Sequence, residues 1–264
     1  MLRVKPGSER DTAPTGDREV TIIVLAKLPI AGRAKTRMCP PCSPVQAADI
    51  AEAALFDTLT AVSCARTQQP SLVGRVVVCL ERLGIEPPPW ITDAGRVIDQ
   101  CEGDLNDRLA HAFASVSGPA ILIAMDTPQV TVELLVEAAS TLLDPKRDSL
   151  IGLSTDGGFW IIGFRACPPD VFRDVSMSTD HTGNDQLRAM TDSGLQPKLL
   201  PVLSDFDTFD DVLAIAECHT GLRTATAVRL VADQIRTNET TRAEGTDNVN
   251  KHRTEHQTVR SGRQ

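Results

Sequence analysis

VTIIVLA, residues 20–26, is the stretch of sequence that decides the fold. Apart from Thr21 it is continuously apolar and rich in β-branched residues, which is typical of a parallel strand buried on both faces. A second run of this kind, AILIAM, occupies residues 120–125. Parallel strands need long crossover connections, which are usually helical. The two runs therefore predict a sheet that is covered by helices.

The chain between and beyond these runs alternates strand-like and helix-like patterns. Further strands are predicted over residues 74–80, 96–98, 149–153, 159–164 and 198–202. Helices are predicted over residues 45–64, 104–116, 131–143, 182–191 and 208–218. Ser43-Pro44 is a helix-start signal, and Thr155–Gly158 is a turn signal between two strands. These repeated units predict an α/β fold, with a mostly parallel central sheet and helices on both faces.

Both ends of the chain differ in composition from its middle. Residues 1–19 are charged and polar, without the apolar core of a signal peptide, and residues 234–264 are poor in apolar side chains. Neither stretch can bury enough apolar surface to offset its ordering entropy, so we expect two disordered segments. One folded domain over residues 20–233 remains. Its longest apolar runs are too short to span a membrane.

The bulk composition excludes some classes of partner. A formal net charge of −8 and a pI of about 5.2 leave no broad basic field for nucleic acid or an anionic membrane. The seven cysteines are odd in number and scattered, which favours reduced thiols in a cytoplasmic protein. The pair Cys39 and Cys42 lacks the second ligand pair of a structural zinc site. An anionic ligand would need a local cluster of cations.

Such a cluster follows the first strand, in the segment Ala26–Arg37. Four cations lie within residues 27–37, together with Gly32 and a proline that shape the backbone. The segment is not a Walker A motif, but it offers ammonium charges and an arginine for bidentate contact with a phosphate. It is therefore a candidate site for a di- or triphosphate. The alternative is a solvated basic loop.

Carboxylates follow several of the predicted strands. Asp126 ends a buried strand, where it would bind a divalent metal or cap the helix that follows. Asp156 precedes two glycines, for which a hairpin turn is also an adequate explanation. Asp104 opens a helix and has an N-cap as its simpler role. Asp205 and Asp207 follow the last strand; either would complete a metal site, and Asp207 would equally cap the next helix.

Taken together, these segments resemble a bacterial family of uncharacterised GT-A-like proteins. The family is described as nucleotide-diphospho-sugar transferases, or glycosyltransferases of the arsenosugar-biosynthesis type. The matching motifs are AKxPxxGxxKTR at 26–37, QxxGDLxxR at 100–108, DxP at 126–128, DGG at 156–158, a Ser-Thr pair at 178–179 and DxDT at 205–208. Phe159 and Met177 stand where the family usually has tyrosine and tryptophan, so the acceptor pocket departs from the family pattern.

The resemblance implies a Rossmann-like GT-A fold that binds a nucleotide through the first loop, with Mg²⁺ or Mn²⁺ on Asp126. The leading hypothesis is metal-dependent glycosyl transfer from a nucleotide sugar to a small-molecule acceptor, with Asp156 or Asp207 as the catalytic base. The expected nucleotide- and phosphate-binding residues are Ala26, Lys27, Gly32, Lys35, Thr36, Arg37, Asp104, Gly157 and Gly158.

Two other functions stay open. One is nucleotidyl transfer from a nucleoside triphosphate to a phosphorylated small molecule. The sequence Asp126-Thr127-Pro128 favours it, because typical GT-A glycosyltransferases carry Asp-x-Asp. The other is a non-catalytic nucleotide-binding module, against which the carboxylates after the strands argue.

Overall fold

A computed structural model describes residues 19–237 of the chain. The two segments predicted to be disordered fall almost entirely outside this range, at residues 1–18 and 238–264. Residues 234–237 are an exception, since they form the end of a helix over residues 223–237. The predicted tail therefore includes four residues that are helical in the structure.

The described residues contain one seven-stranded sheet, in the order β3-β2-β1-β4-β6-β5-β7. Its strands are β1 (Val20–Lys27), β2 (Val73–Glu81), β3 (Arg96–Asp99), β4 (Ala120–Ala124), β5 (Ser149–Ser154), β6 (Phe159–Phe164) and β7 (Lys198–Leu203). Only β6 runs antiparallel to its neighbours, because it forms a hairpin with β5. The prediction of a mostly parallel sheet is confirmed.

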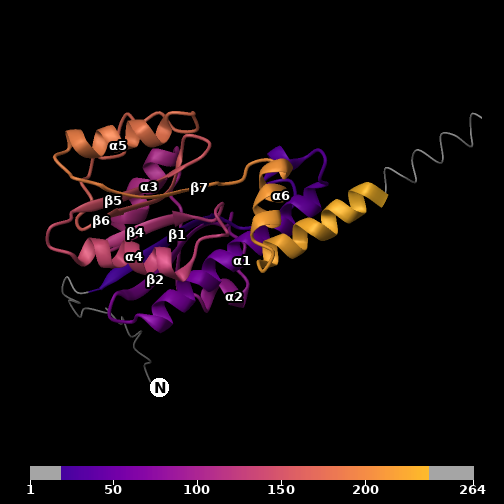
Figure 1. The fold of residues 1–264 in the computed structure, drawn as a ribbon, viewed down its shortest axis with the longest axis horizontal. Helices are drawn as coiled ribbons and strands as arrows, with labels where there is room; N and C mark the ends of the chain where they lie inside the picture. The colour runs from indigo at the N-terminus through magenta and orange to yellow at the C-terminus, as the bar shows by residue number, and fades with distance from the viewer. Residues whose placement is uncertain (1–18, 238–264) are drawn as a thin grey trace, which may run out of the picture.

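Helices cover both faces of this sheet (Figure 1). One face carries α1 (Pro44–Gln68), α2 (Pro89–Thr92) and α4 (Val132–Leu143), and the other carries α3 (Leu105–Ala114) and α5 (Thr182–Asp192). Alternate residues of β1 serve the two layers, since Ile22 packs in the first core and Ile23 in the second. This is why the strand is apolar at successive positions.

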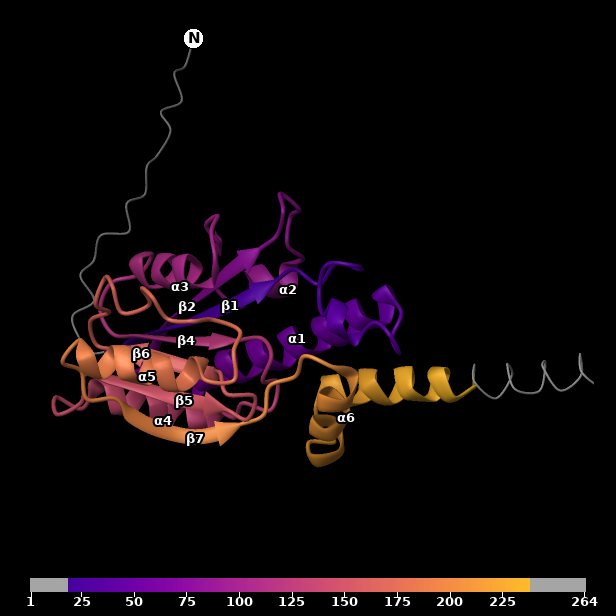
Figure 2. The same cartoon turned by 90° about the horizontal axis from the view of Figure 1, so that it is seen from above.

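A third apolar cluster lies beside the carboxyl edge of the sheet (Figure 2). It joins the first half of α1 to the 3-10 helix η1 (Thr36–Met38), to α6 (Phe209–Cys218) and to the helix over residues 223–237. The carboxylate of Asp57 in α1 accepts hydrogen bonds from the backbone N–H groups of Arg223 and Thr224, at 3.1 and 2.8 Å. The sequence did not predict this last helix, whose N-terminal partner lies far away in the chain.

Two further features concern the chain as a whole. All seven cysteines are free thiols. Within residues 19–237, no helix combines the length and the hydrophobicity that crossing a membrane requires.

Candidate active site

A cavity of about 690 Å³ opens at the carboxyl edge of the sheet. Its walls come from the segments that follow β1, β3, β4, β5 and β7, and from the loop before α5. Ligands of open α/β sheets bind at this edge. The structure brings ten of the predicted site residues to the cavity. They are Ala26, Lys27, Lys35, Thr36, Arg37, Asp104, Asp126, Asp156, Gly158 and Asp207.

Two predicted glycines, Gly32 and Gly157, do not line the cavity. Gly32 has a φ of 77° and open space around it, so it shapes the first loop. Gly157 has a φ of 93°, and a Cβ there would lie 1.9 Å from the carbonyl oxygen of Asp180. The DGG segment is the predicted hairpin turn, closed by Asp156 Oδ1 accepting from the N–H of Gly158 at 2.8 Å. Gly157 lets this turn touch the loop before α5.

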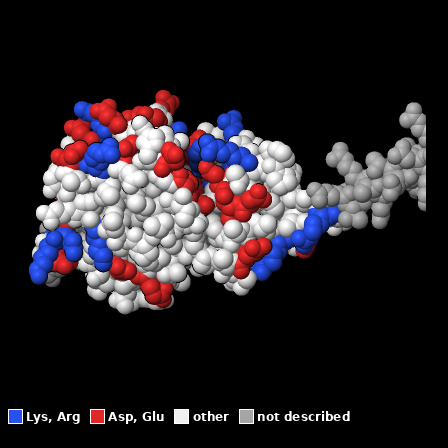
Figure 3. Space-filling model, turned by 45° about the horizontal axis from the view of Figure 1, so that its top comes forward, with Lys and Arg blue, Asp and Glu red and all other residues white. Residues whose placement is uncertain are grey.

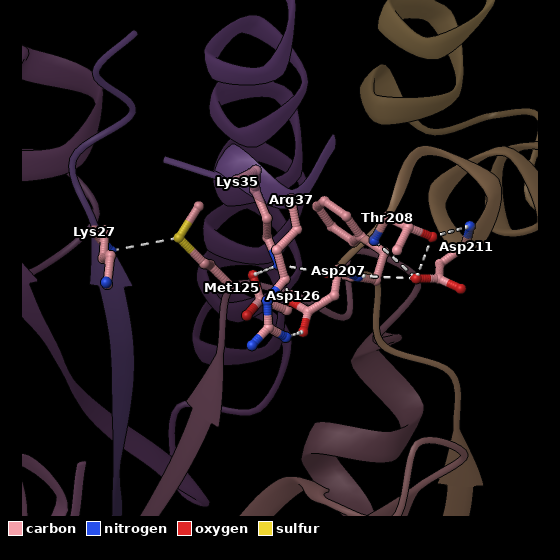
Figure 4. A network of polar contacts seen from close by, with 9 residues as sticks. Lys27, Lys35, Arg37, Met125, Asp126, Asp207, Thr208 and Asp211 are labelled. Carbon is pink, nitrogen blue, oxygen red and sulfur yellow. Dashed lines mark hydrogen bonds and ion pairs between the residues drawn. The ribbon is translucent and has the colours of Figure 1, made fainter. Parts of the chain in front are cut away.

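Lys35 is the central cation of the cavity (Figure 4). Its side chain is only 9% exposed, and its Nζ lies 2.8 Å from Asp126 Oδ1 and 3.3 Å from Asp207 Oδ1. The ammonium also donates to the carbonyl oxygen of Phe206 and lies 4.2 Å from the centroid of that ring. Lys35 therefore ties the loop after β1 to the segments after β4 and β7, facing carboxylates rather than open solvent.

Asp126 and Asp207 do not serve as helix caps. Thr131 caps α4 by accepting from the N–H of Leu134 at 3.3 Å, and Thr208 caps α6 in a capping box with Asp211. The capping alternatives for Asp126 and Asp207 are thus wrong, because a hydroxyl residue stands closer to each helix start. Both carboxylates remain available to the cavity, and Arg37 binds Asp207 Oδ2 at 2.7 Å.

Asp104 keeps the simpler role as well as its place in the cavity wall. Its Oδ1 accepts a hydrogen bond from the N–H of Asp107 at 3.0 Å. The side chain of Asp107 in turn accepts from the N–H of Asp104, which completes a capping box. The carboxylate is thus occupied in starting α3 while it faces the cavity.

Asp205, which the sequence offered together with Asp207 to complete a metal site, also lines the cavity. Its Oδ1 is buried and has no hydrogen-bond partner within the described part of the chain. Burial, followed by repulsion from Asp156 and then from Asp126 and Asp207, raises the pKa of Asp205 to about 6. The sequence indicates both aspartates of the segment Asp205–Thr208 as candidates, but it does not show which of them is more deeply buried in the cavity wall.

A polar network underneath the first loop was also missed. Gln100 Nε2 donates to the carbonyl oxygen of Ala26 at 2.7 Å, and Arg108 donates to Gln100 Oε1 at 3.3 Å. Glu81 Oε2 binds both Arg108 and Lys27, at 3.0 and 3.4 Å. Gln100 and Arg108 are the first and last residues of the QxxGDLxxR motif, and this motif is the sequence feature that could have indicated the network. The network holds the end of β1 and shapes the cavity beside Lys27.

The charges of the cavity suit a divalent cation. Asp126, Asp156, Asp205 and Asp207 supply four carboxylates, and Lys35 and Arg37 are the cations bound to them, which leaves an excess of two negative charges. No group of three or more His, Cys, Asp or Glu within residues 19–237 is arranged to hold a metal alone. Mg²⁺ commonly binds through one or two carboxylates together with substrate phosphates. The unpartnered Oδ1 of Asp205 and the ion-paired Asp126 fit that mode.

Positive and negative side chains are mixed on the described surface. On the face that Figure 3 draws, clustered Lys and Arg side chains lie directly beside Asp and Glu side chains. Such a mixed surface agrees with a small anionic ligand that is recognised locally.

Sequence comparison finds one family. The model of DUF2064, described as an uncharacterised protein conserved in bacteria, matches residues 58–179. The matched segment contains Asp104, Asp126 and Asp156, whereas the loop after β1 and the segment after β7 lie outside it. No curated protein is significantly similar to the chain.

Three solved structures are similar to the chain. A candidate nucleotide-diphospho-sugar transferase from Desulfovibrio desulfuricans G20 has a TM-score of 0.70 and 24% identity over 83% of this chain and 97% of that one. CMP:2-keto-3-deoxy-manno-octonic acid synthetase complexed with CTP has a TM-score of 0.44 and 14% identity, over 76% and 99% of the two chains. Rv0371c from Mycobacterium tuberculosis in complex with manganese has a TM-score of 0.39 and 19% identity, over 75% of this chain and 98% of that one. The chain has a GT-A-like α/β fold, with a mixed, mostly parallel seven-stranded sheet.

Proposed function

We propose that the chain is a metal-dependent glycosyltransferase that uses a nucleotide-diphospho-sugar donor. The observation that carries the proposal is the cavity at the carboxyl edge, where cations of the first loop meet an excess of carboxylates around Lys35. A diphosphate needs the cations, and the metal that accompanies it needs the carboxylates. The similarity to a candidate nucleotide-diphospho-sugar transferase supports the same reading of the fold.

The cations of the first loop divide into two roles. Lys35 is enclosed by carboxylates, so we assign it to holding Asp126 and Asp207 in place. Arg33 and Arg37 are exposed at the cavity, and we assign them, with Lys27, to the phosphates of the donor. An arginine can contact phosphate oxygens in a bidentate manner, which fixes the orientation of the diphosphate.

The carboxylates of the cavity also have different proposed roles. Asp126, with Asp205 beside it, would hold the divalent metal, which when bound neutralises charge on the departing diphosphate. Asp207 is engaged by Lys35 through Oδ1 and by Arg37 through Oδ2, so both of its oxygens are occupied by ion pairs. Asp156 has no Lys or Arg partner in the described range. We therefore assign the role of catalytic base to Asp156 in preference to Asp207.

Nucleotidyl transfer is the second candidate function, and one observation favours it. Asp126 is followed by Thr127 and Pro128, so the second aspartate of an Asp-x-Asp motif is missing. In this reaction a phosphorylated molecule would attack the α-phosphate of a nucleoside triphosphate and release pyrophosphate. The same cations and metal would serve it.

The released product separates the two reactions. The protein is incubated with Mn²⁺ or Mg²⁺ and with panels of nucleotide sugars, nucleoside triphosphates and small acceptors. Glycosyl transfer releases a nucleoside diphosphate, and nucleotidyl transfer releases pyrophosphate. If calorimetry detects binding of neither class of nucleotide, both proposals are refuted.

A matched pair of variants links the result to the cavity. Asp126→Asn should reduce metal-dependent nucleotide binding at least about tenfold, because a metal ligand is lost while the side chain keeps its shape. Asp192→Asn, at an exposed position at the end of α5, should bind like the wild type. Equal binding by all three proteins would remove Asp126 from the metal site.

A further inference from the structure

The cavity has two ends of opposite character. The lining residues that precede β4 in the chain include one carboxylate, Asp104, and all of the Lys and Arg side chains of the cavity, which are Lys27, Arg33, Lys35, Arg37 and Arg108. From Asp126 onward the lining contains no Lys, Arg or His, but it contains Asp126, Asp156, Asp180, Asp205 and Asp207. The order of the strands separates these two groups of residues in space, because β1, β2 and β3 lie on one side of β4, and β5, β6 and β7 lie on the other.

Two cations reach across to the acidic end, but both are already bound there. Lys35 lies against Asp126 and Asp207, and Arg37 binds Asp207. No Lys or Arg within the described residues pairs with Asp156, Asp180 or Asp205. Asp180 has only the imidazole of the adjacent His181, at 2.8 Å. Asp156 and Asp180 therefore keep their negative charge in the acidic end even when a metal occupies Asp126 and Asp205.

The remaining walls of the acidic end are uncharged. Phe159 and Met177 contribute a ring and a thioether, and Ser178 and Thr179 contribute hydroxyl groups from the loop before α5. Gly157 holds this loop close to the β5–β6 turn, since the N–H of Gly183 donates to its carbonyl oxygen at 2.7 Å. These groups can pack against carbon and hydrogen-bond to hydroxyls, but none offers a positive charge to an anion.

We propose that the acceptor binds at this acidic end and is a hydroxyl compound without a phosphate or carboxylate group, either neutral or positively charged. This proposal rests on the proposed glycosyl transfer. The acceptor hydroxyl oxygen forms a bond to the anomeric carbon of the donor sugar, and its proton goes to Asp156. The bond between that carbon and the diphosphate oxygen breaks, and its electron pair leaves with the nucleoside diphosphate.

The physical reason is the cost of placing like charges together. The phosphate of an anionic acceptor would lie beside Asp156 and Asp180, whose carboxylates would repel it. A hydroxyl group instead donates a hydrogen bond to a carboxylate, and an ammonium group gains from the negative charge. The acidic end thus discriminates by repulsion, which is a common source of specificity.

The test compares acceptors in pairs that differ only in charge. The full chain is incubated with Mn²⁺ and a nucleotide sugar that binds by calorimetry, and release of nucleoside diphosphate is measured with glycerol against glycerol 3-phosphate, and with glucose against glucose 6-phosphate or glucosamine. Neutral or amino members should give kcat/KM values at least about tenfold higher than the phosphorylated members. Equal or better use of the phosphorylated members would overturn the proposal. A donor that is neither bound nor hydrolysed refutes the proposed function itself.

A charge reversal gives an independent readout. The Asp180 side chain is 93% exposed at the rim, so Asp180→Lys should fold normally. It should shift the ratio of kcat/KM for phosphorylated over neutral acceptors upward by about tenfold, since it places a cation at the acidic end. Asp192→Lys, exposed and outside the cavity, makes the same change of net charge and should leave the ratio unchanged. An identical ratio in both variants would place the acceptor elsewhere.

Discussion

Lys35 joins parts of the chain that are far apart in sequence. Its ammonium lies between Asp126, after β4, and Asp207, after β7, with the carbonyl oxygen and ring of Phe206 completing its surroundings. Its backbone has a φ of 50°, which non-glycine residues adopt infrequently. A cation in such a position holds two carboxylates together that would otherwise repel each other.

Lys35→Met should therefore destabilise the metal-free protein by about 1–2 kcal/mol, because two partly exposed carboxylates lose their shared cation. Added Mn²⁺ should recover part of this loss and raise the melting temperature of the variant more than that of the wild type. Thermal unfolding with and without Mn²⁺ measures both effects.

Lys198→Met is the control for the loss of a lysine. Lys198 pairs with Glu137 on the surface at 3.1 Å, away from the cavity. This variant should show little destabilisation and no additional effect of Mn²⁺. If Lys35→Met behaves in the same way, Lys35 does not organise the acidic site.

The folding stability of the protein should depend on pH through Asp205. Burial and the neighbouring aspartates raise its pKa to about 6, whereas the pKa of an unfolded aspartate is about 3.9. The folded state thus holds the proton more tightly, so this group contributes stability below about pH 4 that is lost as the pH rises through about 6.

In the presence of a chelator, the difference in unfolding free energy between wild type and Asp205→Asn should change between pH 4 and pH 6. The wild type should lose stability relative to the variant over this window, because only the wild type must ionise a buried carboxyl group. Urea titrations at half-unit pH steps measure it. A constant difference would show that the Asp205 side chain does not carry the shift.

At the scale of elements, the apolar runs predicted the strands and most helices well. Residues 20–26 and 120–125 correspond to β1 and β4, and Ser43-Pro44 does begin α1. The helix over residues 223–237 was not predicted from the sequence. The carboxylate that accepts from the N–H of Arg223 at its N-terminus belongs to Asp57, 166 residues earlier. A cap supplied from so far away leaves no local sequence signal.

Asp57→Ala should destabilise the protein by about 1–2 kcal/mol, since two backbone N–H groups and the hydroxyl of Thr224 lose their acceptor. The loss should concentrate in residues 223–237, whose amide hydrogens should exchange faster. Urea unfolding with hydrogen exchange tests this. Glu52→Ala, at an exposed position of the same helix α1, should change neither quantity; matching behaviour of the two variants would argue against the cap.

At the scale of the whole molecule, the topology explains why the site was partly predictable. Parallel strands end at one edge, so residues that follow different strands could be expected to meet there. Lys27, Lys35, Arg37, Asp126, Asp156 and Asp207 do meet around one cavity. Their pairing was not predictable, because it depends on the path of the first loop and on Thr131 and Thr208 taking the caps.

The same topology separates the charges. Cations from the loops before β4 face carboxylates from the loops after it, and Lys35 and Arg37 bridge the boundary. This arrangement suits a donor diphosphate on one side and its metal at the boundary. A divalent metal and a diphosphate should therefore meet beside Asp126.

The position of the metal can be measured in a crystal of the protein grown with Mn²⁺ and a nucleoside diphosphate, through the anomalous scattering of manganese. We expect one strong peak within direct coordination distance of the Asp126 carboxylate, bridged to phosphate oxygens that Arg33 or Arg37 contacts. A nucleotide bound elsewhere, or a manganese peak away from Asp126 while the nucleotide occupies the cavity, would show that Asp126 does not hold the metal of a metal–diphosphate site.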